Sequence, residues 1–274
     1  MTALELIDRW SPPTTAAAIV GPGGVIAARG PVDQPFQLAS VTKPLAALAT
    51  LVAVEEGALD LSSPADDSLL PGATIRHLLA HASGIAPDMR MRVSRPGARR
   101  IYSNVGFDLL GERVEAAVGM PFDSYLAEAV VTPLQLRHTV LHGSPAKDGW
   151  ASASDLTRVI GDLLAPSALL HASTIADATN VQFPGLSGVV PGFGRQDRND
   201  WGLGFEMRDD KAPHWTGRTN SPATYGHFGQ SGTMFWVDPV ARIGLVSLSD
   251  LQFDKWAAKA WPQLSDEVLA ETAS

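Results

Sequence analysis

A serine and a lysine stand three positions apart in Ser40-Val41-Thr42-Lys43. On a helix such positions are neighbours, offset by roughly 60° and ~4.5 Å of rise, so the lysine amine can reach the serine hydroxyl. A serine hydroxyl is a weak nucleophile until a base takes its proton, and lysine can be that base if burial or a nearby cation lowers its pKa. The spacing therefore predicts a nucleophile, Ser40, with Lys43 as a proton carrier.

The serine–lysine spacing is not specific by itself, because chance alone gives about 0.4 copies in a chain of this composition. A second copy exists, Ser144-Pro145-Ala146-Lys147. The first copy opens a strongly apolar helical stretch, and the free N–H groups at a helix start can face a developing oxyanion. Ser144 lies in a Gly- and Pro-containing loop segment with no periodic run behind it, so Ser40 is favoured.

A second set of polar residues, Tyr102-Ser103-Asn104, directly precedes a helical pattern from Val105. A tyrosine near a lysine can shuttle protons, and an asparagine can hold both a substrate carbonyl and the lysine amine. The alternative is a helix N-cap, because Ser and Asn favour that position. Both interpretations can hold at once.

A third set is His227-Phe228-Gly229, which is followed by Gln230. Glycine lets a strand approach a substrate closely, and the Gln230 N–H could complete an oxyanion hole with the N–H of Ser40. The alternative is a glycine-rich turn before a strand at Thr233.

The elements that must position these residues fall into three stretches. Near the N-terminus we expect a short helix over 4–10 and a hairpin of two apolar runs, 16–20 and 25–28, around Gly21-Pro22-Gly23-Gly24. The middle is helical, with helices expected over 40–56, 75–81, 105–118, 122–131 and 154–164. An exposed polar loop over 192–200 then leads to strands at 202–207, 233–237 and 243–249 and to a closing amphipathic helix. The hairpin and the last strands must pair across the helical middle to bury their apolar faces.

Composition limits the function further. The chain has 274 residues, a net charge of -8 and no cysteine, so nucleic-acid binding, disulfides and thiolate catalysis are not expected. The basic cluster formed by Arg90, Arg92, Arg95, Arg99 and Arg100 is expected to be a solvated loop. Neither a signal peptide nor a membrane span is visible, which predicts a soluble cytoplasmic protein. The sequence leaves the oligomeric state open.

Taken together and in this order, the three sets resemble the motifs of the serine β-lactamase and penicillin-binding-protein superfamily. The similarity is greater to the branch of AmpC-type β-lactamases, D-alanyl-D-alanine carboxypeptidases and family VIII-type esterases. His77-Leu-Leu-Ala-His81-Ala-Ser-Gly-Ile and Trp201-Gly-Leu-Gly are also similar, so the resemblance covers roughly residues 14–250. It implies an α/β (α+β) β-lactamase/transpeptidase-like fold, an antiparallel sheet flanked by helices plus a mostly helical insert.

The resemblance also implies roles for individual residues. Ser40 would be acylated, Lys43 and Tyr102 would move protons, Asn104 would orient the substrate, and His227 would line the site. We expect one catalytic domain over 1–274, with the α/β part roughly at 1–60 and 195–274 and the helical part roughly at 61–194. No cofactor or metal is implied. His77 and His81 stand four apart, but the glutamate of H-E-x-x-H is absent, so they are expected to be structural.

One departure from the superfamily bears on the substrate. The third set begins with histidine where a lysine would give a fixed positive charge for a substrate carboxylate, and histidine is mostly neutral near pH 7. We therefore expect small neutral esters as substrates, with a β-lactam or a D-amino-acid peptide as the alternative.

Two other classes of protein fit the sequence less well. An α/β-hydrolase needs G-x-S-x-G, and Gly229-Gln-Ser231-Gly-Thr fails at its last position. A non-enzymatic sensor would be acylated without turnover; the Ser/Lys/Tyr set argues against it, but sequence does not measure deacylation.

Overall fold

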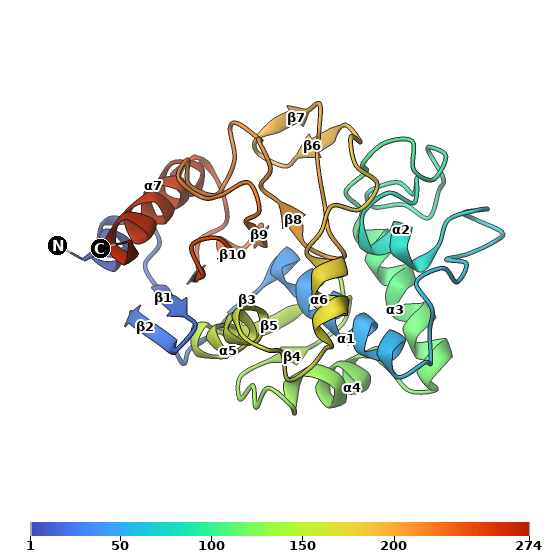
Figure 1. Ribbon diagram of the computed structural model, residues 1–274, viewed down its shortest axis with the longest axis horizontal. Helices are drawn as coiled ribbons and strands as arrows, with labels where there is room; N and C mark the ends of the chain where they lie inside the picture. The colour runs from blue at the N-terminus through green and yellow to red at the C-terminus, as the bar shows by residue number, and fades with distance from the viewer. Residues whose placement is uncertain (1, 274) are drawn as a thin grey trace.

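A six-stranded antiparallel sheet joins the two ends of the sequence in the computed structural model, which describes residues 2–273 (Figure 1). Along the sheet the strands are β2 (Gly24–Arg29), β1 (Thr15–Gly21), β11 (Ile243–Ser249), β10 (Thr233–Asp238), β9 (Tyr225–Gly229) and β8 (Glu206–Met207). The register of β1 against β11 runs from Thr15 opposite Ser249 to Val20 opposite Gly244. The predicted hairpin and its pairing with the last strands are confirmed.

Both faces of the sheet are covered. Successive side chains of a strand point to opposite faces, and in β1 Ala16 and Ala18 enter one apolar core while Ala17 and Ile19 enter the other. The first core is closed by α5 (Ala153–Leu164) and the second by α7 (Lys255–Thr272) together with the 3₁₀ helix Ala3–Arg9. Figure 1 shows α5 and α7 on opposite sides of the strands. The sheet is thereby a rigid support for residues at its edge.

The helical part is built around α1 (Thr42–Glu55), whose residues from Thr42 to Leu51 are all buried. Around it lie α2 (Ile75–Leu79), α3 (Asn104–Val118), α4 (Phe122–Leu126) with the π turn Ala127–Val131, and α6 (Ala172–Ala178). A helix that is apolar on all sides can be stable only as a core helix. The first turn of α1, which carries Lys43, is therefore fixed by packing.

Two small sheets complete the fold, and neither was predicted from the sequence. One has the order β3 (Pro35–Gln37), β5 (Gly149–Ser152), β4 (Val140–Leu141); the other pairs β6 (Gly188–Val190) with β7 (Gly194–Gln196). Next to the first sheet, the Leu38 N–H donates to the Gly149 carbonyl over 2.9 Å. This sheet therefore holds the segment that leads into Ser40.

Several expected boundaries were wrong. The helix expected over 40–56 begins at Thr42, after a 3₁₀ turn over Ala39–Val41. The strand expected over 202–207 is reduced to Glu206–Met207, because Gly204 adopts φ 87° and a Cβ there would collide with that of Ala47. The helix over 4–10 is a 3₁₀ helix, and that over 122–131 becomes a π turn after Leu126.

Two expectations about exposure were also wrong. The segment 192–200 is not a simple exposed loop, since it contains β7 and buries Asn199 and Asp200. In the basic cluster Arg100 is buried, with 3% of its surface exposed. Its guanidinium donates to four carbonyl oxygens, those of Ala80, Gln182, Phe183 and Asn199. Those acceptors satisfy the donors that would otherwise keep an arginine in water. Within residues 2–273, no helix is both long and apolar enough to cross a bilayer.

Candidate active site

Ser40 lies in the 3₁₀ turn immediately before α1, half-buried. The residue before it, Ala39, adopts φ 45°, a left-handed conformation that a side chain disfavours. Such strain is held in place only by the surrounding structure and is frequent at functional sites. The Thr42 hydroxyl donates to the Ala39 carbonyl over 2.7 Å and accepts from the Gly149 N–H over 3.0 Å. These contacts fix the turn that presents Ser40.

The Lys43 amine is buried among oxygen atoms. Its Nζ lies 3.2 Å from Ser40 Oγ, 2.7 Å from Asn104 Oδ1 and 2.9 Å from the Ala146 carbonyl oxygen. Two of these three partners, Asn104 Oδ1 and the Ala146 carbonyl, can only accept hydrogen bonds. A neutral amine has two N–H groups for them and one lone pair, which then faces Ser40.

The charge state of Lys43 follows from its surroundings. Burial lowers the pKa of Lys43 to about 7, against the attraction of Asp108 and Asp88, while Lys147 lowers it further. A substantial fraction of the amine is therefore neutral near pH 7. This meets the condition for a lysine base.

Tyr102 and Asn104 lie at the start of α3, where Ser103 is the N-cap and its Oγ accepts from the Gly106 N–H over 2.9 Å. The N-cap alternative is therefore confirmed, and it coexists with a place in the site. Lys43 Nζ lies 4.6 Å from the centre of the Tyr102 ring, and the tyrosine hydroxyl is hydrogen-bonded to Ser40. Burial raises the pKa of Tyr102 more than the bond to Ser40 lowers it, so the phenol keeps its proton.

The Asn104 amide is fixed at both ends. Its Oδ1 accepts from Lys43, and its Nδ2 donates to Asp88 Oδ1 over 2.8 Å. The lysine amine and the carboxylate together determine the orientation of the amide.

His227 lies on β9, across the site from Ser40. Its Nδ1 donates to the Phe228 carbonyl oxygen over 2.7 Å, which leaves Nε2 unprotonated and, within residues 2–273, without a hydrogen-bond partner. Burial and the charge of Lys43 lower the pKa of His227 to about 3. The imidazole is therefore neutral, and its ring packs against Tyr102 and Trp201 at centroid distances of 5.8 Å and 5.4 Å.

Gly229 and Gln230 follow His227 at the end of β9. A Cβ on Gly229 would lie 2.6 Å from Thr233 Oγ1 and 3.2 Å from the Ser40 nitrogen, and closer still to the Leu38 carbonyl. Only glycine lets β9 approach the Ser40 backbone this closely. The Gln230 side-chain amide donates to the Phe253 carbonyl over 3.1 Å, away from the site.

A pocket of about 190 Å³ collects these residues. Its lining includes five residues predicted from the sequence, namely Ser40, Tyr102, Asn104, His227 and Gln230, and four others, Pro191, Trp201, Glu206 and Phe228. Lys43 lies beneath Ser40, and Gly229 borders it from β9. The structure therefore brings all seven predicted residues to one place.

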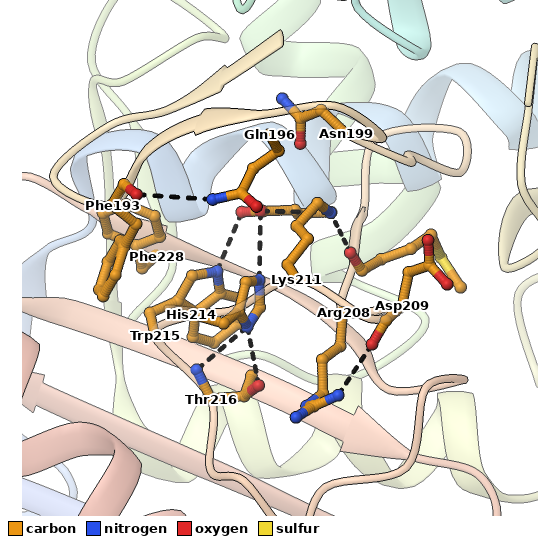
Figure 2. A network of polar contacts seen from close by, with 12 residues as sticks. Phe193, Gln196, Asn199, Arg208, Asp209, Lys211, His214, Trp215, Thr216 and Phe228 are labelled. Carbon is orange, nitrogen blue, oxygen red and sulfur yellow. Dashed lines mark hydrogen bonds and ion pairs between the residues drawn. The ribbon is translucent and has the colours of Figure 1, made fainter. Parts of the chain in front are cut away.

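Glu206 is the one ionisable residue among these four additions to the pocket lining. It is an isolated acid in a short strand, and its environment comes from a loop without periodicity. His214 Nε2 and Trp215 Nε1 donate to its two oxygens over 3.2 Å and 2.9 Å, and Lys211 Nζ lies 3.5 Å away. Figure 2 shows Lys211, His214 and Trp215 gathered in this network. Burial would raise the pKa of Glu206, but these partners outweigh it and lower the pKa to about 2.

The serine and the two histidines that were not expected to be catalytic lie outside the pocket lining. Ser144 donates its hydroxyl proton to Asp108. His77 Nδ1 accepts from the Thr74 N–H over 3.2 Å, and its ring stacks on Phe183. His81 packs behind the site with its ring centroid 4.6 Å from that of Tyr102. Over residues 2–273 there is no group of three or more acidic or histidine side chains arranged for a metal ion.

Comparison with known proteins covers nearly the whole chain. A sequence model described as Beta-lactamase matches residues 7–270. A crystal structure of a β-lactamase from Mycobacterium bovis is 51% identical, covers 100% of both chains and superimposes with a TM-score of 0.96. A hydrolase with promiscuous acyltransferase activity shares the fold, with 19% identity, a TM-score of 0.81, and coverage of 97% of this chain and 96% of its own.

The curated relatives are longer. A putative D-alanyl-D-alanine carboxypeptidase from Escherichia coli O157:H7 is 28% identical over 240 residues, which cover 68% of this chain and 54% of that protein. The chain thus spans about half the length of the curated relatives it matches. With its antiparallel sheet flanked by helices and its three motifs in order, the chain belongs to the β-lactamase family, within the serine β-lactamase and penicillin-binding-protein superfamily of serine hydrolases.

Proposed function

We propose that this chain hydrolyses small neutral esters through an acyl-enzyme on Ser40. The observation that carries the proposal is the hydrogen-bond pattern of Lys43. The ammonium form can donate to all three neighbours of Nζ; in the neutral form the two protons go to Asn104 Oδ1 and the Ala146 carbonyl, and the lone pair is left for the Ser40 hydroxyl. A pKa of about 7 keeps this form populated near neutral pH.

The first half of the reaction forms the acyl-enzyme. Ser40 Oγ bonds to the ester carbonyl carbon while its proton passes to Lys43 Nζ, and the N–H groups of Ser40 and Gln230 stabilise the oxyanion. The acyl–oxygen bond then breaks. Tyr102, whose phenol is protonated, gives its proton to the departing alkoxide and is reprotonated by the proton that Lys43 took from Ser40. This assigns the base to Lys43 and the acid to Tyr102, which the sequence left open.

The second half of the reaction regenerates the free enzyme. Water takes the place of the alcohol, loses a proton toward Lys43 and attacks the acyl carbon, and Ser40 Oγ leaves with a proton. Asn104 is fixed by both Lys43 and Asp88, which suits it to orient the substrate carbonyl. No step needs a cofactor. The strands at both ends of the sequence share one sheet, so we treat residues 1–274 as one catalytic unit.

The preference for neutral esters rests on the charges around the pocket. His227 stands where a cation would receive a substrate carboxylate, and its imidazole is neutral. Glu206, which also lines the pocket, is ionised. Although Lys211 balances that charge from behind, neither side chain offers a positive charge to a carboxylate beside the scissile bond.

A second candidate is β-lactam hydrolysis, favoured by 51% identity over full length to the protein described as a β-lactamase. The relatives named as putative D-alanyl-D-alanine carboxypeptidases raise peptide hydrolysis as a further alternative. Both activities would use the same nucleophile and differ only in the substrate.

One comparison separates these candidates. We would measure kcat/KM for 4-nitrophenyl butyrate and for a chromogenic cephalosporin, in the wild type and in Ser40→Ala. We expect the ester to be preferred and both activities to vanish in the variant. A tenfold cephalosporin preference, about 1.4 kcal/mol of transition-state stabilisation, would replace ester by β-lactam hydrolysis.

The same experiment tests the nucleophile and the sensor alternative. A fluorophosphonate probe should label the wild type and leave Ser40→Ala unlabelled. Labelling without turnover of any substrate would make the chain an acylated sensor, and labelling that persists in Ser40→Ala would refute the assignment of Ser40.

A further inference from the structure

A larger cavity adjoins the pocket that holds Ser40. It measures about 600 Å³, which lies within the usual range of about 300–1,000 Å³ for small-molecule sites. Tyr102 and Pro191 line both it and the catalytic pocket. The two spaces therefore meet at Tyr102 and Pro191.

The walls of the cavity are apolar. Val93, Ile101, Val189 and the prolines Pro87 and Pro191 contribute to them. Val93 and Val189 leave 40% and 57% of their surface exposed, which is unfavourable for valine in water and is relieved when a ligand covers it. The chemistry of these walls fits an extended hydrocarbon group.

The floor of the cavity is held rigidly by Arg100. The Arg100 N–H donates to the Ser187 carbonyl over 2.9 Å, and its guanidinium donates to the carbonyls of Gln182 and Asn199 over 2.8 Å and 2.9 Å. These bonds tie the segment before Tyr102 to the segment around β6. The cavity therefore exists without its ligand, so binding does not require the walls to be ordered.

The rim carries two arginines, Arg99 and Arg195, on a chain whose net charge is -8. Both are exposed. Within residues 2–273, Arg99 has no ion-pair partner, and Arg195 has only Asp197 at 4.0 Å, where both side chains are largely in solvent. Unlike Arg100, whose donors are all directed at carbonyls, these two guanidiniums are available to an anion.

The position of Tyr102 decides which part of the substrate enters. In the proposed reaction Tyr102 protonates the leaving oxygen, so the alcohol part of the ester lies on the Tyr102 side of the scissile bond. We propose that the cavity binds this alcohol part, and that the alcohol is an elongated apolar group ending in an anion that Arg99 and Arg195 hold. The inference rests on the proposed ester hydrolysis at Ser40 and adds the substrate class.

The anion must be remote from the reacting atoms. Beside Ser40 a carboxylate would meet neutral His227 and ionised Glu206, whereas at the far end of an alkyl chain it meets two cations. The reaction itself is unchanged: the acyl–oxygen bond breaks, the alcohol leaves with a proton from Tyr102, and water completes the carboxylic acid.

Two matched substrates test the inference: the butyrate ester of ω-hydroxyoctanoate and the methyl ester of the same molecule, which lacks the charge. Butyrate release gives kcat/KM for each. We expect the wild type to prefer the anion about five- to tenfold, from two solvent-exposed contacts to arginine, and to lose the preference as salt is raised. Arg99→Gln/Arg195→Gln should abolish it, while the control Arg95→Gln/Arg158→Gln, with the same change of charge outside the cavity, should keep it.

Hydrolysis of 4-nitrophenyl butyrate, which does not reach the rim, should be equal in all of these proteins. If it proceeds normally but the charged and uncharged long esters are equivalent, the cavity inference is overturned and the proposed function stands. A binding measurement tests the inference even if the protein hydrolyses none of these esters. In Ser40→Ala, calorimetry should detect ω-hydroxyoctanoate bound more weakly after the double arginine substitution, and no binding would overturn the inference independently of turnover.

Discussion

Substitution of Lys43 by methionine should change the stability of the protein in a way that depends on pH. In the folded chain burial lowers the Lys43 pKa from its usual 10.5 to about 7. Between these two pH values the unfolded chain binds more protons than the folded chain, so the free energy of unfolding rises with pH. The contribution is most unfavourable below pH 7 and disappears above pH 10.5.

The magnitude follows from the same pKa change. A tenfold change in proton affinity is worth about 1.4 kcal/mol, so the Lys43 contribution to stability rises by about 2 kcal/mol between pH 7 and pH 9. Lys43→Met removes this contribution. It also leaves Asn104 Oδ1 and the Ala146 carbonyl without their donor, at about 1–3 kcal/mol, but that loss has no pH dependence. Between pH 7 and pH 9 the free energy of unfolding of the wild type should therefore rise by about 2 kcal/mol relative to that of Lys43→Met.

Urea unfolding followed by tryptophan fluorescence at pH 7 and pH 9 measures this difference. Lys255→Met, which alters an exposed lysine on α7, is the control and should keep a constant difference from the wild type. A constant difference for Lys43→Met as well would mean that Lys43 does not titrate in this range. The lysine could not then be a neutral base near pH 7, and the proposed acylation step would fail.

Three further substitutions test other parts of the site. Tyr102→Phe should lower kcat by about 10²–10⁴-fold on ethyl butyrate and far less on 4-nitrophenyl butyrate, whose leaving group needs no proton; equal losses would exclude Tyr102 as the acid. Gly229→Ala should lower kcat by about 10²–10³-fold, because its Cβ would displace β9 from the oxyanion hole, while Gly161→Ala, with open space around it, should stay active. Full activity of Gly229→Ala would show that the N–H groups of Ser40 and Gln230 do not form the oxyanion hole. Arg100→Met should destabilise the protein by about 2–4 kcal/mol in calorimetry, since four carbonyls lose their donor, whereas the exposed Arg99→Met should not. Equal melting temperatures for Arg100→Met and the wild type would show that water replaces the guanidinium.

The sequence predicted the assembly of the site better than its surroundings. Ser40 and Lys43 are close because they share a short helical spacing, and Tyr102 and Asn104 are close because both sit at one helix start. His227 stood in a glycine-rich run before the strand expected at Thr233, and only the resemblance to the superfamily placed it in the site. The two local pairs needed only neighbouring residues, whereas joining the three sets into one site needed the family resemblance.

The residues that escaped prediction depend on partners far along the chain. Arg100 looked like part of an exposed basic run, and only the carbonyls of Gln182, Phe183 and Asn199 explain its burial. Glu206 owes its charge state to a loop that shows no periodicity. The left-handed conformation of Ala39, which makes Ser40 part of a 3₁₀ turn rather than of α1, is set by tertiary contacts and leaves no mark in the sequence.

The pairing of β1 with β11 has a consequence for the order in which the enzyme acquires its chemistry. During synthesis Ser40 and Lys43 leave the ribosome early, but β9, which carries His227 and Gly229, lies in a sheet completed only when β11 meets β1. Contacts between such distant segments form slowly, because a long loop must close first. Until then the N–H of Gln230 cannot lie beside that of Ser40, so half of the proposed oxyanion hole is missing. Ser40 and Lys43 can therefore meet early in synthesis, but full reactivity appears only when the last strands have paired.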